Sequence, residues 1–118
     1  KPNTDDIRES MSIKLIKNLS PLVKRINLYD PLANDEAKRE LIDFKNLKFF
    51  NNKYRALSNS DSLIIATEWK EFWDPDLKKL RKLKSKIIFD GRNHLDHKAL
   101  YEIGFNVYPI GKPALKHL

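Results

Sequence analysis

Two short and almost continuous apolar runs constrain the fold of this 118-residue chain more than any other feature. They are residues 62–67 (SLIIAT) and residues 86–89 (KIIF). Runs of this length are typical of strands that are covered on both faces, as in parallel sheets. Between them, Asp74-Pro75 predicts a helix start, because Asp suits the N-cap and Pro suits the first helical position. The sequence therefore predicts a strand–helix–strand unit.

The same alternation extends over the whole chain. Further strands are predicted at residues 25–29, 47–50 and 105–108, and helices at residues 10–19, 34–42, 54–59, 74–83 and 96–104. This order favours an α/β fold, a doubly wound and mostly parallel Rossmann-like sheet of about five strands with helices on both faces. The length suggests a single domain, 1–118, and the tail at 113–118 is expected to be loose.

Two absences narrow the chemistry that this stretch can carry by itself. The first strand ends at Tyr29-Asp30 and is followed by Pro31, so the glycine-rich loop that cradles a dinucleotide phosphate is missing. The sequence has no cysteine, which excludes a cysteine nucleophile within it. His94 and His97 lie three residues apart with no second ligand pair, so no metal site is predicted.

The chain is basic, with 23 Lys and Arg against 16 Asp and Glu. This charge favours an anionic partner such as a nucleic acid, an acidic surface or a phosphorylated small molecule. The densest basic run is residues 78–86. Leucines recur at every third position just before and within it, and they would form a buried stripe: Leu77, Leu80 and Leu83. The run lacks the interleaved aromatic residues of single-strand binders, which favours a solvated helix face.

Polar residues follow the predicted strands at the sheet edge where ligands of open α/β sheets bind. They are Asp30, residues 67–70 (TEWK) and residues 90–93 (DGRN). Gly91 permits a sharp turn or a close approach, and Arg92 offers the planar fork that suits a diphosphate. The alternative, which the residues leave open, is that Arg92 pairs with Asp90 or Asp96.

The first ten residues, KPNTDDIRES, are dense in charge and lead directly into a helical pattern. Asp6 and Glu9 fit a capping box at the helix start. A loop that enters a helix N-terminus can hold an anion, and Lys1 and Arg8 flank that position. In the alternative interpretation, Arg8 forms a surface pair with a neighbouring carboxylate, and Lys1 is an ordinary terminal lysine.

Three motifs in this order, KPNTDDIRES, IIATEWKEF (64–72) and IIFDGRN (87–93), resemble the C-terminal, UDP-binding domain of the UDP-glucose/GDP-mannose dehydrogenase family. The resemblance covers residues 1 to about 112. One departure is Met11, where many members have proline or serine.

The resemblance implies a fragment of an NAD-dependent enzyme that oxidises UDP-glucose to UDP-glucuronate in two steps, in cytoplasmic polysaccharide biosynthesis. The N-terminal domain would hold NAD, and the catalytic cysteine would lie in the middle of the full chain. This stretch would therefore have no catalytic residue and be inactive alone. By the family pattern, Lys1 and Arg92 contact the substrate and Arg8 reaches NAD.

The implied partners are UDP-glucose, the remaining domains of the same chain and a second copy in a homodimer, with no nucleic acid and no membrane. Two other functions stay open at this point. One is a related dehydrogenase that acts on GDP-mannose or a UDP-N-acetylhexosamine. The other is a basic α/β module that binds nucleic acid or protein through residues 78–86.

Overall fold

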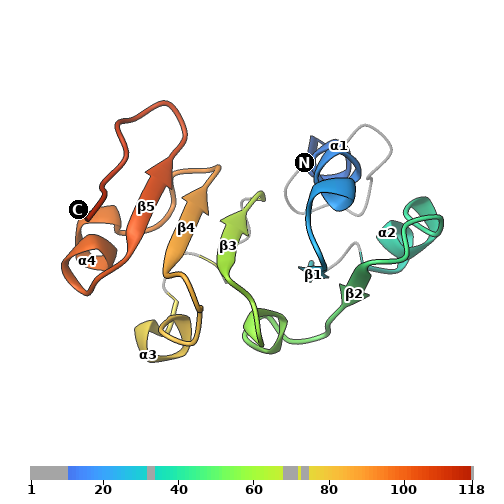
Figure 1. Cartoon of the computed structure of the whole chain (residues 1–118), viewed down its shortest axis with the longest axis horizontal. Helices are drawn as coiled ribbons and strands as arrows, with labels where there is room; N and C mark the ends of the chain where they lie inside the picture. Colours follow the sequence, from blue (N-terminus) through green and yellow to red (C-terminus); the bar gives the residue numbers. More distant parts are fainter. Residues whose placement is uncertain (1–10, 32–33, 68–71, 73–74, 118) are drawn as a thin grey trace. The chain divides into compact units, whose positions relative to one another are not determined.

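A computed structural model of the chain describes residues 11–31, 34–67, 72 and 75–117 (Figure 1). These residues contain five strands, and all neighbouring strands among them are parallel. The α/β class and the expected number of strands are thus confirmed. The strands are divided between two sheets, ordered β1-β2 and β3-β4-β5. The chain divides into two compact units between Ala56 and Leu57. The assignment of the whole chain to a single domain stays a prediction.

The first unit combines a two-stranded sheet with two α-helices. Its elements are α1 (Met11–Leu19), the 3-10 helix η1 (Ser20–Leu22), β1 (Ile26–Leu28), α2 (Asn34–Glu40) and β2 (Leu47–Phe49). Pro21 lies in η1 where α1 ends, as its missing N–H predicts. Ile13, Ala37 and Leu41 form the buried core. The weak helix expected at 54–59 is a single 3-10 turn, η2 (Arg55–Leu57).

The second unit holds the three-stranded sheet. Its elements are β3 (Ser62–Ile65), α3 (Leu77–Leu80), β4 (Ile87–Asp90), α4 (His97–Glu102) and β5 (Asn106–Pro109). Paired residues of parallel strands share a face, and Ile88 and Val107, which pair, are fully buried. The opposite face is open, since Ile64 and Phe89 are each 40% exposed. Helix α3 lies in the connection between β3 and β4, and α4 lies in the connection between β4 and β5.

The helix boundaries of the second unit test three expectations. Asp96 is the N-cap of α4, where its carboxylate accepts a hydrogen bond from Ala99 N at 3.1 Å. Gly104 follows that helix with a φ of +107°, the left-handed conformation of a helix stop. The expected start of α3 at Asp74 lies outside the described residues.

Helix α3 corrects the longer helix predicted at residues 74–83. It is one turn long, and its N-cap is Asp76, whose carboxylate accepts from Lys78 N at 3.0 Å. Leu80 and Leu83 are buried as predicted, but Leu77 is 37% exposed. A one-turn helix cannot hold three successive leucines on one buried face.

Two residues of the tail expected to be loose, Leu115 and His117, make long-range contacts. Leu115 forms two backbone hydrogen bonds with Val107, of 2.8 and 2.9 Å, in an antiparallel bridge beside β5. The His117 ring stacks on Tyr101, with ring centroids 4.2 Å apart. Such long-range contacts have no signal in the local sequence pattern, and the loose character of the tail stays a prediction.

Candidate functional site

The DGRN turn lies at the carboxyl edge of the three-stranded sheet. Ile65, the last residue of β3, pairs with Asp90, the last residue of β4. Gly91 N donates a hydrogen bond to the Ile65 carbonyl oxygen at 2.9 Å. A Cβ atom on Gly91 would lie 2.8 Å from the same oxygen, so any other residue type would force the backbone to shift. Gly91 therefore serves a close backbone approach, one of the two roles predicted for it.

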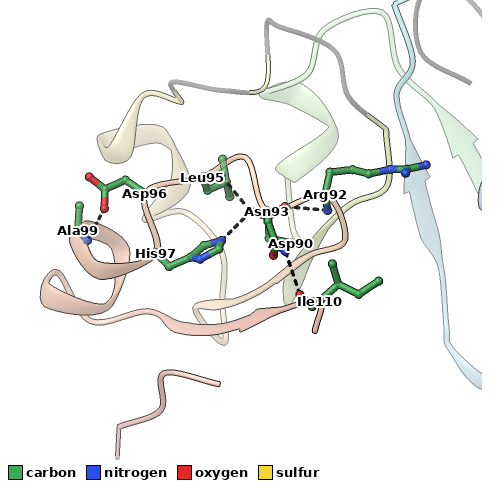
Figure 2. Close-up of polar contacts among 8 residues, drawn as sticks. All are labelled: Asp90, Arg92, Asn93, Leu95, Asp96, His97, Ala99 and Ile110. Carbon is green, nitrogen blue, oxygen red and sulfur yellow. Dashed lines mark hydrogen bonds and ion pairs between the residues drawn. The ribbon is translucent and has the colours of Figure 1, made fainter. Parts of the chain in front are cut away.

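Arg92 is exposed and is oriented by the neighbouring strand. Its Nε donates to the carbonyl oxygen of Ala66, directly after β3, at 3.1 Å. In Figure 2 its side chain extends from the turn away from the Asp90 carboxylate. Asp90 meets Arg92 instead through the backbone, because its Oδ1 accepts from Arg92 N at 3.1 Å. The Nε bond fixes the guanidinium plane at the sheet edge, as a phosphate-binding group requires.

Asp90 is the buried charge of this turn, with 0% of its surface exposed. Its Oδ2 accepts from Leu95 N at 2.9 Å and contacts His97 Nε2 at 2.8 Å. Burial disfavours the charged carboxylate and raises its pKa. The hydrogen bonds from Leu95, His97 and Arg92, together with the charge of a protonated His97, outweigh this effect and hold the pKa of Asp90 below its usual value.

Asn93 attaches the same turn to the third strand. Its Nδ2 donates to the carbonyl oxygen of Ile110, just after β5, at 2.9 Å (Figure 2). Its φ of 57° lies in the left-handed region, which asparagine tolerates better than most residues. The DGRN turn is thus bonded to the ends of β3 and β5 while it continues β4, so Arg92 projects from a rigid support.

Sequence reasoning identified Arg92 and Gly91 but missed what holds them. Asp90 was considered as a polar residue of the ligand-binding edge and as an ion-pair partner of Arg92, and His97 was considered only as a metal ligand. The available signal was the spacing in Asp-Gly-Arg, since an aspartate that accepts the N–H two residues later forms an Asx turn. The contact with His97 needs the tertiary fold and has no local signature.

The described structure does not test whether the other predicted site residues lie near Arg92. Lys1 and Arg8 lie outside the described residues, as do Glu68 and Trp69 of the turn after β3. The described end of that strand, Ala66, does lie beside Arg92. Asp30 follows β1 in the first unit.

The basic run is exposed at each of its cations: Lys78, Lys79, Arg81, Lys82, Lys84 and Lys86. Because α3 ends at Leu80, these residues do not share one helix face. Among residues 11–31, 34–67, 72 and 75–117, no three His, Asp or Glu side chains are grouped to hold a metal ion. In the same part of the chain, no helix has the length and apolar character needed to cross a membrane.

Comparison with known proteins places the chain in a family. Residues 1–97 match the model of the UDP-glucose/GDP-mannose dehydrogenase family, UDP binding domain. UDP-glucose 6-dehydrogenase of Pseudomonas aeruginosa is 36% identical over 121 residues, covering 99% of this chain and 27% of that protein. The Drosophila melanogaster enzyme of the same name is 34% identical over 128 residues, with coverages of 95% and 26%.

A third relative is UDP-glucose 6-dehydrogenase TuaD of Bacillus subtilis, 32% identical over 117 residues, covering 98% of this chain and 25% of that protein. The chain contains an α/β unit with a parallel sheet, a class of domain in which ligands bind outside the carboxyl ends of the strands. The chain belongs to the UDP-glucose/GDP-mannose dehydrogenase family. It spans about a quarter of the length of these curated relatives.

Proposed function

We propose that this chain is the UDP-sugar-binding domain of an NAD-dependent UDP-glucose 6-dehydrogenase, in which Arg92 binds the diphosphate of UDP-glucose. The observation that carries the proposal is the hydrogen bond from Arg92 Nε to the Ala66 carbonyl. It orients a guanidinium at the edge where ligands of parallel sheets bind. A guanidinium fixed in this way loses little further side-chain freedom when it binds phosphate.

The enzyme as a whole would oxidise UDP-glucose to UDP-glucuronate for polysaccharide biosynthesis in the cytoplasm, and would act as a homodimer. NAD, when bound, would supply the hydride acceptor for both oxidations. The sequence has no glycine-rich loop after β1, so NAD does not fit this domain as its main binding site. We assign NAD to another part of the protein, with Arg8 reaching toward it and Lys1 contacting the substrate.

The central test is Arg92→Ala in the full-length enzyme. Loss of a charge-assisted hydrogen bond to phosphate, worth roughly 1.5–3 kcal/mol, raises the KM for UDP-glucose roughly ten- to a hundredfold. Arg92→Lys recovers only part of this loss, because an ammonium group cannot form the bidentate bond. The matched control is Arg81→Ala, which removes an exposed arginine of the basic run in the same unit.

The outcomes separate the proposed function from its alternatives. An unchanged KM in Arg92→Ala, with intact folding, makes Arg92 a structural residue of the turn. A larger effect of Arg81→Ala on an anionic partner points instead to the basic run. Turnover of GDP-mannose or a UDP-N-acetylhexosamine above that of UDP-glucose reassigns the substrate within the family.

Lys1 and Arg8 are assigned to different ligands, which kinetics can separate. Arg8→Ala should raise the KM for NAD more than that for UDP-glucose, and Lys1→Ala should do the reverse. The seven-residue separation allows more than roughly 10 Å between the two charges, at ~3.3 Å per extended residue. If Arg8→Ala leaves the NAD dependence unchanged, its role is wrong and a surface ion pair explains it better.

The isolated 118-residue chain gives a simpler test. It has neither a cysteine nor a glycine-rich phosphate loop, so we expect no NADH from UDP-glucose and NAD. Turnover above a control without protein contradicts the assignment of catalysis to other parts of the enzyme.

A further inference from the structure

The carboxylate of Asp90 connects three structural elements at the candidate site. Asp90 is the last residue of β4. Its Oδ1 accepts from Arg92 N in the turn, and its Oδ2 accepts from Leu95 N. The same Oδ2 contacts Nε2 of His97, the first residue of α4, at 2.8 Å (Figure 2). One buried side chain therefore joins the strand end, the turn that carries Arg92 and the helix that follows.

His97 is built into this arrangement as a donor. A carboxylate accepts hydrogen bonds but cannot donate them, so Nε2 of His97 must carry a proton to make this bond. The side chain of His97 is only 14% exposed, and that of Asp90 is not exposed. Water therefore has little access to replace the bond if His97 is lost, and a buried carboxylate with too few donors is strongly disfavoured.

We propose that His97 is a positioning residue for Arg92 and acts through Asp90; this inference rests on the proposed function of Arg92. With His97 present, three donors determine the orientation of the Asp90 carboxylate. With His97 replaced by an apolar side chain, the carboxylate rotates to recover a partner and weakens its bond to Arg92 N. The guanidinium then samples more orientations, and its bidentate bond to phosphate becomes less favourable.

The test uses the full-length enzyme with His97→Leu, which keeps an apolar volume without a donor, and His97→Gln, which keeps a terminal N–H donor. We expect His97→Leu to raise the KM for UDP-glucose about three- to tenfold, the effect of one weakened charge-assisted bond. The KM for NAD and the kcat at saturating UDP-glucose stay unchanged. His97→Gln restores at least half of the affinity.

The matched control is His117→Ala, which removes another hydrogen-bonded histidine of the same unit. Its Nε2 lies 2.8 Å from the Tyr101 carbonyl oxygen, apart from the Asp90 network, so the KM for UDP-glucose stays unchanged. Arg92→Ala is measured in parallel as the reference for the proposed function. Circular dichroism verifies folding, and His97→Ala replaces His97→Leu if that variant does not fold.

Each outcome decides between the two proposals. If Arg92→Ala raises the KM but His97→Leu does not, the positioning role is wrong while the proposed function stands. If His97→Gln is as impaired as His97→Leu, the side chain acts through packing and the positioning role is again wrong. If Arg92→Ala has no effect, the proposed function fails, and the role of His97 fails with it.

Discussion

In each of the two units, the hydrogen bonds of one polar side chain hold a loop in place. One of these side chains is a neutral amide and the other is a carboxylate. In the first unit, Asn46 precedes β2, and its Nδ2 donates to the carbonyl oxygens of Ser20 at 2.8 Å and Val23 at 3.1 Å. Its Oδ1 accepts from the hydroxyl of Ser20. In the second unit, Asp90 ends β4 and only accepts, from Arg92, Leu95 and His97.

The difference shows what each environment demands. An amide donates and accepts without a charge, so neighbours of both kinds can satisfy it. A buried carboxylate needs donors on every side, which makes its loop more rigid and also dependent on ionisation. The buried carboxylate of Asp90 lies at the carboxyl edge of the sheet, where we propose that the substrate diphosphate binds. There a fixed guanidinium matters most.

The largest expected effect is that of Asp90→Asn. The amide must direct its NH₂ toward at least one of the N–H donors that now bind the carboxylate, leaving buried groups unpaired. We expect a loss of about 3 kcal/mol in local stability. Hydrogen exchange of amides 87–97 in the full-length protein measures it. Asp96→Asn is the control, because Asn caps a helix as well as Asp does, and equal losses in both variants contradict the argument.

The next effect is that of Gly91→Ala. A methyl group 2.8 Å from the Ile65 carbonyl oxygen must displace the backbone of β3 or of the turn. Such overpacking destabilises by about 2 kcal/mol. Gly111→Ala is the comparison, since a Cβ there meets no atom within 4 Å and only the φ of 68° is unfavourable. Hydrogen exchange near both glycines should show the larger loss at Gly91, and the reverse order excludes steric approach as its role.

A smaller effect is expected for Asn46→Asp, the reverse exchange in the first unit. The carboxylate cannot donate to Ser20 and Val23, and their carbonyl oxygens repel it. Partial solvent access limits the loss to about 1 kcal/mol. Hydrogen exchange at residues 20–28 and 44–50 provides the measurement. Asn51→Asp adds the same charge at an exposed neighbour, so a similar loss there attributes the effect to charge alone.

Local patterns predicted most of the fold because they report local physics. The apolar run at 62–67 contains β3, and the run at 86–89 covers β4 except its last residue, Asp90. Asp96 and Gly104 delimit α4 as their capping chemistry requires. Helix α3 was predicted too long, because the leucine spacing continues to Leu83 although the helix ends at Leu80.

The candidate site was predictable only in part. Arg92 and Gly91 stand out because an arginine and a glycine directly follow a buried strand. The Ala66 carbonyl that orients Arg92 lies 26 residues away in sequence, and His97 reaches Asp90 only once α4 is in place. Such contacts depend on strand register and helix docking, for which a single sequence has no local signal.

The smallest effect is the acid sensitivity of the second unit. The pKa of Asp90 is lowered in the folded protein from a value near 3.8, so its ionisation stabilises the fold above that pH. This stabilisation is lost as the pH falls through the lowered pKa of the folded state. At pH 3 the loss is at most about 1 kcal/mol, since the carboxylate of the unfolded chain is by then mostly protonated.

Hydrogen exchange between pH 5 and pH 3, corrected for the intrinsic exchange rate, should show this loss at residues 87–97. The neutral Asn46 loop should show none from this source. Other carboxylates titrate in the same range, so the contribution of Asp90 is the difference between the native protein and Asp90→Asn. If both have the same acid dependence, the Asp90 carboxylate is not what makes the turn sensitive to pH. The two loops would then differ in geometry but not in electrostatics.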